Sequence, residues 1–409
     1  MELPLRRLGA VLVGGSADDR YGRRLVVALA VTQTAGYGAL YYAFSVFLTP
    51  MQGELGAGVA SLTVALTLGR VVAGMAAPVV GRWLDRWGGR WPMTAGSLLG
   101  AAGLLLWSRV ETLLQLYLVF VLIGVASAMV LYDAALTIVV GWFDPRRRAR
   151  ALLAVTIVAG LASTVFVPLT GFLVERYGWR LALVILGLGY GVVAVPLHGL
   201  VLRRRKTVDR SEVAPPNGAV RERAFLLLAA AFVAQTCATT VVGVLLVTYL
   251  IVLGHSPVFA AAVAGLLGVL SVTGRLVTSG LRTRFPVALV TAAVFALQAT
   301  AAALLPVVGR SPAGAIAAVV LFGLGFGVAT IARPTLLADR YGTAGYGALS
   351  GALALPVTVA AALAPLAAAL LAEEAGYAVV LSAVAAACAV GAVALLGYHR
   401  IPVVSSEAA

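Results

Sequence analysis

Twelve long apolar segments run along this chain, and they leave few folds open to it. A transmembrane α-helix needs about 20 mostly apolar residues, and windows of that length recur throughout the sequence. Hydrophobic residues make up 61% of the chain and charged residues only 11%, with a mean hydropathy of +1.01, whereas soluble domains carry about 25% charged residues. We therefore predict an all-α integral membrane protein with transmembrane helices at residues 25–49, 58–80, 91–108, 112–141, 149–174, 180–201, 224–253, 258–280, 285–307, 312–334, 345–371 and 376–398.

The second half of the sequence echoes the first. Similar segments surround Gln33 and Gln235, Gly124 and Gly323, and Arg70 and Arg275. Repeats of this parallel kind place a substrate site near the middle of the membrane, between the halves. We predict two pseudo-symmetric six-helix bundles at 25–202 and 224–400, a cytosolic linker at 203–223, and cytosolic tails at 1–24 and 401–409.

The basic residues are unevenly spread. Basic residues outnumber acidic ones by 30 to 16, for a formal net charge of +14. Most fall in segments that an inside amino terminus would place in the cytosol, including Arg146, Arg147, Arg148, Arg150, Arg203, Arg204, Arg205 and Lys206, whereas the outer loops hold Arg109, Arg176, Arg180 and Arg310. This asymmetry follows the positive-inside rule, so we predict that both termini are cytosolic and that nucleic acid is not a partner. The single lysine, with abundant Ala, Gly and Val, favours a bacterial source and hence the inner (cytoplasmic) membrane.

A short charged turn separates the second and third apolar segments. Glycines permit the tight turn, and Asp85 could cap a neighbouring helix end or pair with an arginine. The turn resembles the signature loop of major facilitator superfamily transporters, Gly-x-x-x-Asp-Arg-x-Gly-x-Arg/Lys, which it matches at Gly81, Asp85, Arg86, Gly88 and Arg90. The resemblance implies the major facilitator fold and a gating role for Asp85, Arg86 and Arg90. The counterpart in the second half, near 280–285, lacks the acidic residue.

Four ionisable residues lie well inside the predicted spans: Arg70, Asp133, Arg275 and Arg333. Each costs about 2.5–3.5 kcal/mol at a helix centre on an insertion scale, so these positions are candidates for function. The alternative for each arginine is a structural role, in pairing or in snorkelling to the interface. Arg70 is a candidate second anion-facing charge or a packing partner between helices.

The eighth segment resembles that of monocarboxylate and oxalate porters within the superfamily, in which an arginine holds the substrate carboxylate. The resemblance implies that role for Arg275, and the Tyr-Ala-Phe run at 42–44 is similar to a first-helix segment of the same porters. The sequence departs from those porters at Ser271 and Val46, which stand where some of them carry an aspartate proton carrier and a lysine. Gln33, Tyr37, Tyr41 and Gln235 are further candidates to hydrogen-bond a polar ligand, although the tyrosines could equally serve only for packing.

Asp133 and Arg333 fall at similar depths when the halves are aligned on Gly124 and Gly323. We predict a charge pair that closes the inner gate, in which losing one partner harms transport more than losing both. Asp133 is also the default proton carrier, a role that conflicts with permanent pairing. Gly323 and Gly327, at helical spacing, predict a close-packing face.

These observations favour a secondary active transporter for a small organic anion, foremost a monocarboxylate, that works by alternating access with proton coupling as an open option. The alternative is proton-driven efflux of amphipathic or drug-like compounds, based on a degraded antiporter motif at 167–171. A membrane sensor without transport activity has no appended domain in its favour. No metal-ligand cluster or phosphate-binding loop is visible, so we expect no cofactor and no enzymatic activity, and we expect a monomer.

Overall fold

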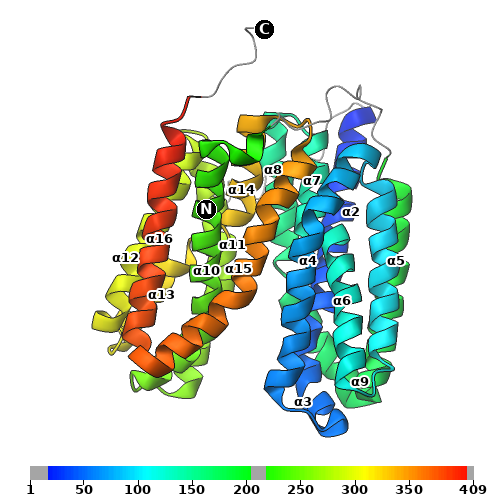
Figure 1. Cartoon of the computed structure of the whole chain (residues 1–409), viewed down its shortest axis with the longest axis horizontal. Helices are drawn as coiled ribbons and strands as arrows, with labels where there is room; N and C mark the ends of the chain where they lie inside the picture. Colours follow the sequence, from blue (N-terminus) through cyan, green and yellow to red (C-terminus); the bar gives the residue numbers. More distant parts are fainter. Residues whose placement is uncertain (1–16, 204–217, 403–409) are drawn as a thin grey trace, which may run out of the picture. The chain divides into compact units, whose positions relative to one another are not determined.

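The computed structural model describes residues 17–203 and 218–402, and within these ranges every regular element is a helix. Most of the predicted 1–24 tail, most of the 203–223 linker with Arg204, Arg205 and Lys206, and nearly all of the 401–409 tail lie outside the described residues. Figure 1 shows the order of the helices along the chain.

The prediction of an all-α membrane protein is confirmed. Among the described residues, nine helical stretches are long and apolar enough to cross a membrane. One of them, Arg147–Val201, contains the two predicted spans 149–174 and 180–201, which are separated by the non-helical residue Gly178 with φ 77° and ψ 161°. The other predicted spans correspond to the eighteen-residue helix α5 (Arg90–Trp107) and to the pair α13 (Pro312–Gly323) and α14 (Ala329–Tyr341).

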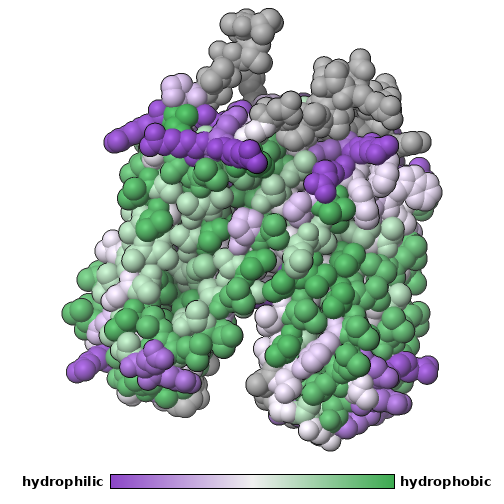
Figure 2. Space-filling model, viewed as in Figure 1, coloured by the Kyte–Doolittle hydropathy of each residue, from purple (hydrophilic) through white to green (hydrophobic). Residues whose placement is uncertain are grey.

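The chain groups into two compact units. The first comprises Met1–Leu66 and Arg86–Thr207, and the second comprises Thr67–Asp85 and Val208–Ala409. The units resemble the predicted halves except that Thr67–Asp85, within α4 (Val59–Trp87), groups with the second unit. The boundaries of the two six-helix bundles therefore remain a prediction. Figure 2 shows apolar side chains over the middle of the visible face of each unit and polar ones toward its ends.

The first unit is built around an aromatic core. Phe44, Phe47 and Phe120 surround the fully buried Trp107 with ring centroids 4.8–5.8 Å apart. The Trp107 indole N–H donates to the sulfur of Met51 at 3.3 Å. The helices of this unit, with the first part of α4, are α2 (Ala17–Tyr37), the π-helix η1 (Gly38–Tyr42), α3 (Ala43–Leu55), α5, α6 (Leu113–Val130), α7 (Tyr132–Trp142), α8 (Pro145–Ala159), α9 (Ala162–Pro196) and the π-helix η2 (Leu197–Val201).

The second unit has a mainly aliphatic core, to which Leu246 and Leu381 contribute together with Phe322 and the fully buried Cys388. Because lipid tails are as apolar as these side chains, close packing rather than water exclusion holds such helices together. Its helices, with the part of α4 at Thr67–Asp85, are the 3-10 turn η4 (Ala219–Arg221), α10 (Arg223–Val252), α11 (Pro257–Leu281), α12 (Val287–Val308), α13, α14, α15 (Tyr346–Ala375) and α16 (Tyr377–His399).

Three predicted spans are interrupted near their middles. One is 149–174, at Gly160 and Leu161 between α8 and α9, and the breaks in the other two are called here the first break and the second break. The span 112–141 breaks at Leu131, which has φ −81° and ψ −165° between α6 and α7. The span 312–334 breaks over 324–328, between α13 and α14. Backbone groups freed inside a membrane must find partners within the protein, so each break requires polar side chains nearby. These side chains define the site.

Candidate functional site

Arg275 lies in α11 and is buried, with 6% of its surface exposed. Its Nε donates to the carbonyl oxygen of Gly327, within the second break, at 3.3 Å. The backbones come close here because a Cβ at Gly274 would collide with the carbonyl oxygen of Leu324. The predicted substrate-binding arginine is thus held against an interrupted helix.

The second break also receives a polar side chain from α12. Gln298, which is fully buried, donates from Nε2 to the carbonyl oxygen of Phe322 at 2.8 Å. Its Oε1 accepts from Nε2 of Gln235 in α10 at 2.6 Å. The Cys388 thiol lies 3.8 Å from Gln235 Oε1 and can donate to it. The structure therefore pairs Gln235, predicted to contact the substrate, with Gln298, and only 1% of its surface is exposed; its role as a ligand contact remains a prediction.

The first break is supported in a similar way. Gln33 is fully buried in α2 and donates from Nε2 to the carbonyl oxygen of Val130, the last residue of α6, at 2.6 Å. The sequence prediction of a ligand contact at Gln33 likewise stays untested. Asp133, half-buried, follows directly in the first turn of α7, where the helix dipole favours a negative charge.

Tyrosines gather beside the first break. Tyr37 ends α2, and Tyr41 lies in the π-helix η1 that follows it. The Tyr37 ring centroid is 4.6 Å from that of Tyr132 and 6.3 Å from that of Tyr41. The back of η1 is packed so closely that a Cβ at Gly38 would collide with the Phe166 ring. Tyr37 and Tyr41 are half-buried, and their predicted contact with substrate is compatible with this position.

The signature loop is anchored on α15. The Asp85 carboxylate accepts hydrogen bonds from the backbone N–H groups of Gly347 at 2.8 Å and Ala348 at 2.7 Å. It thereby caps the first turn of that helix, where the macrodipole also favours an anion. Capping was one of the two alternatives that the sequence suggested. Arg86 and Arg90 are exposed, and their guanidinium carbons lie 5.6 and 6.0 Å from the ring centroids of Trp87 and Trp91.

The two remaining intramembrane charges are half-buried. Arg70 lies in the part of α4 that belongs to the second unit, and Arg333 follows the second break in α14. Asp133 belongs to the first unit and Arg333 to the second, so their pairing remains a sequence prediction.

Sequence reasoning missed several buried polar groups. Gln298 had a visible signal, since a glutamine inside an apolar span needs a partner. In the first unit His198 lies between two hydroxyls, with Nδ1 2.7 Å from Ser97 Oγ and Nε2 3.0 Å from Thr32 Oγ1. This contact fastens η2 to α5 and α2. Among the described residues no group of three His, Cys, Asp or Glu side chains could hold a metal ion.

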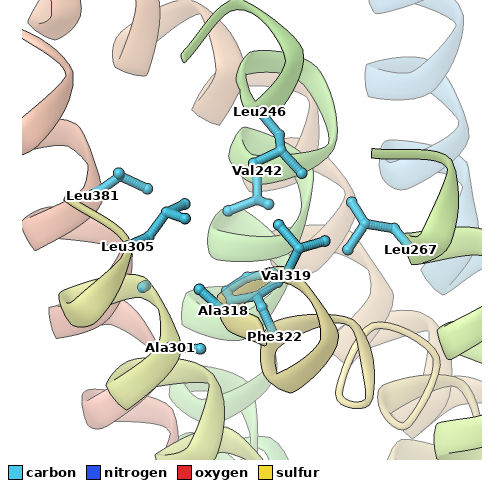
Figure 3. Close-up of a pocket in the computed structure, with 10 residues that line it drawn as sticks. Val242, Leu246, Leu267, Ala301, Leu305, Ala318, Val319, Phe322 and Leu381 are labelled. Atoms are coloured by element: carbon cyan, nitrogen blue, oxygen red, sulfur yellow. The ribbon is translucent and has the colours of Figure 1, made fainter. Parts of the chain in front are cut away.

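A small pocket in the second unit offers no polar chemistry. Figure 3 shows that its lining side chains are aliphatic or aromatic, among them Leu267 of α11 and Phe322 of α13. The pocket lies beside the second break: Phe322 lines it, and the Phe322 carbonyl accepts the hydrogen bond from Gln298. We read it as a gap in packing next to that break.

Buried charges and interrupted helices inside apolar spans characterise the class of multi-pass membrane transporters. The sequence profile of the Major Facilitator Superfamily matches residues 31–356, and the chain belongs to this superfamily. The family prediction is thereby confirmed, and it indicates a membrane transporter of small molecules rather than an enzyme.

Individual relatives agree with this assignment. Monocarboxylate transporter 13 of Bos taurus is 27% identical over 332 residues, covering 78% of this chain and 75% of that protein. The oxalate:formate antiporter of Oxalobacter formigenes is 26% identical over 190 residues, covering 46% of this chain and 45% of the antiporter. The crystal structure of a bacterial homologue of the iron transporter ferroportin, in its outward-facing state, has a TM-score of 0.75 at 14% identity and covers 93% of this chain and 100% of that one. At that identity the likeness shows the fold alone.

Proposed function

We propose that this protein is a secondary active transporter that carries a small monocarboxylate across the bacterial inner membrane by alternating access, with both termini cytosolic. The observation that carries the proposal is Arg275, a cation buried in the span of α11 beside an interrupted helix. The similarity to a monocarboxylate transporter and to an oxalate:formate antiporter supports the same class of substrate.

The chemistry of arginine suits this substrate class. A guanidinium stays protonated in proteins and presents a planar fork that matches a carboxylate. In a poorly solvated setting its attraction to an anion is stronger than in water. A bound carboxylate would also offset part of the cost of burying the Arg275 charge. Tyr37 and Tyr41 remain proposed contacts for a polar ligand on the grounds of the sequence.

The proposal extends to proton coupling and gating. Asp133 is the proposed proton carrier, because it is a carboxylate at a helix start inside an apolar span. Arg333 is its proposed partner at the inner gate, and Arg70 is a second candidate anion-facing charge. We further propose that Asp85, Arg86 and Arg90 take part in gating through the contact of the signature loop with α15.

Uptake into liposomes tests the proposal. Purified protein is reconstituted, and uptake of labelled lactate and pyruvate is followed with and without an inward proton gradient. We expect uptake by the unmodified protein and a loss of at least about tenfold in Arg275→Gln, since truncating one partner of a buried charge pair costs 2 kcal/mol or more. Arg310→Gln, at an exposed arginine, is the matched control and should transport normally.

The opposite results are equally informative. Failure to transport any organic anion would reject the proposed substrate class and favour efflux of amphipathic compounds. Uptake that survives in Arg275→Gln would keep an anion transporter and remove Arg275 from its binding site.

A further inference from the structure

We propose that the break between α13 and α14 is a hinge used during transport, and that Gln298 is the positioning residue that holds its bent form. Only the transport measurement in its test rests on the proposed function. The hydrogen bonds that define the hinge all lie within the second unit.

The backbone at this break is wound more tightly than an α-helix. Gly325 N–H donates to Phe322 at 3.2 Å, Phe326 N–H to Gly323 at 3.0 Å, and Val328 N–H to Gly325 at 3.3 Å, all spaced as in a 3-10 turn. Regular α-helical bonding resumes where Ala332 N–H donates to Val328 at 2.9 Å. Glycines at 323, 325 and 327 make this stretch easy to rearrange, because they tolerate many backbone conformations. A glycine-rich 3-10 segment within a helix is a common site of bending.

The side-chain amides that support the break have one possible orientation. A carbonyl oxygen can only accept, so Gln298 must turn its NH₂ group toward Phe322. Its oxygen then faces Gln235, which must present its own NH₂ group in turn. The Cys388 thiol can donate to the remaining oxygen of Gln235. This directed chain links α16, α10 and α12 and ends on the break, so it favours one backbone geometry at Phe322.

The opposite side of the break is held by α11. Arg275 Nε donates to the Gly327 carbonyl at 3.3 Å, and the Thr330 hydroxyl donates to the same oxygen at 2.6 Å. A ligand that draws the Arg275 guanidinium toward itself would weaken the hold on Gly327 and leave Thr330 and Gln298 as the side-chain supports of the break. Substrate binding and bending of this helix would in this way be coupled. Arg333, carried by α14, would move with the bend.

The break has a polar support and borders a small apolar gap. Phe322 lines the apolar pocket of Figure 3, so its ring borders unfilled space rather than a fully packed core. The first unit offers an independent example of the same device, since Gln33 holds the carbonyl of Val130 at the first break. A buried glutamine that donates to a backbone carbonyl at the break of a span thus occurs in each unit.

Three variants on α12 test the proposal. Gln298→Met keeps the length of the side chain and removes its donor, whereas Gln298→Glu keeps a donor because a buried carboxylic acid stays protonated. Thr291→Val is the matched control, since Thr291 is fully buried on the same helix but bonds only to its own backbone at Val287. For each variant, hydrogen exchange is measured over 320–335, together with KM and maximal rate of uptake.

In Gln298→Met we expect exchange over 324–328 to speed up about fivefold, the change that follows from losing one hydrogen bond. The maximal rate should fall by at least a similar factor with KM nearly unchanged. Gln298→Glu and Thr291→Val should behave like the unmodified protein. Unchanged exchange and rate in Gln298→Met would overturn the proposal, as would faster exchange spread evenly over the second unit, which would indicate a purely stabilising residue. If no organic anion is transported by any form, the exchange result still decides the hinge while the proposed function fails.

A variant at a glycine serves if Gln298→Met does not fold. A Cβ at Gly325 would collide with the Gln298 amide, which is the far end of a flexible side chain. Gly325→Ala should therefore displace that amide from Phe322 without altering Gln298 itself, and reproduce the local rise in exchange. Exchange equal to that of the unmodified protein would contradict the proposal.

Discussion

The signature loop and its counterpart in the second half of the sequence, near 280–285, make different contacts. At the first loop Asp85 caps α15, and the backbones of Gly81 and Gly347 are so close that a Cβ on either would collide with the carbonyl oxygen of the other. At the second loop Gly280 faces open space, with no atom within 4 Å of where a Cβ would lie. Arg282 there carries a buried Nε and Nη1 without hydrogen-bond partners, and burial lowers its pKa despite the opposing influence of Asp339.

The difference shows that two loops at corresponding places in the sequence can join similar helices and yet differ in their acidic residue and its hydrogen bonds. The first loop combines an anion, a helix start and a glycine contact, which together fix one docking geometry. The second unit instead has its tight backbone contact within the membrane, where Gly274 meets Leu324 beside the second break. We infer that the first loop takes part in gating through a buried clamp at the start of α15, and the second unit through an internal hinge.

The largest expected effect comes from removing the anion of the first loop. Asp85→Asn keeps the size of the side chain but points an NH₂ group at one of the two backbone N–H donors, Gly347 or Ala348. Hydrogen bonds to charged groups contribute about 1.5–3 kcal/mol each, so we expect the initial uptake rate to fall at least tenfold. Arg284→Gln, an exposed position in the second loop, is the control. A similar loss in both variants would show that the two loops do not differ as we argue.

A smaller effect is expected from substituting the glycine at the corresponding position of each loop, Gly81 in the first and Gly280 in the second. In Gly81→Ala the new methyl meets the backbone of Gly347, which cannot rotate away, so we expect about 1–3 kcal/mol of destabilisation. Gly280→Ala adds a methyl to open space and improves helix propensity, which favours stability by up to about 1 kcal/mol. Thermal unfolding of both variants in detergent would show opposite signs. Equal shifts would mean that the loops are packed alike.

The sequence could predict the fold and the buried charges because both depend on composition. An arginine such as Arg275 is conspicuous within an apolar segment, whatever its neighbours in space. The break at Leu131 gave no such signal, since neither glycine nor proline occurs at that point and α6 and α7 read as one apolar span. At the second break, Gly323 and Gly327 were predicted to form a close-packing face. They do lie against Leu270 and Ser271 of α11, but their place in the interruption was not visible.

The glutamines show where sequence reasoning stops. Gln33 and Gln235 were recognised as polar groups inside spans, and ligand contact was one reason for their presence. Their observed partners are the carbonyl of Val130 and the amide of Gln298, both distant in sequence. Whether a buried amide faces a cavity or a broken backbone depends on such partners, so periodicity alone could not decide it.

The smallest expected effect concerns an ion pair at an exposed end of the first unit, between Arg180 and Glu54. It tests whether an exposed contact contributes to stability and transport as the buried contact of Asp85 does. Arg180 donates from Nε to Glu54 at 2.8 Å and also holds the carbonyls of Ser108 and Val110. The hydrogen bonds from Arg180 and then Trp179 lower the pKa of Glu54.

A lowered pKa means that this contact stabilises the folded state above the ordinary pKa of glutamate and stops doing so as the pH falls through the lowered value. The Glu54 side chain is 47% exposed, so solvent weakens the effect. Glu54→Gln should therefore lower the melting temperature by no more than about 2 °C near neutral pH, and the gap to the unmodified protein should close as the pH falls through the lowered pKa of Glu54. Exposed Glu111→Gln is the control. A gap that persists in acid would show that the contribution of Glu54 does not depend on its charge. A large loss of uptake in Glu54→Gln would show that this exposed contact matters for transport as well as the buried contact of Asp85.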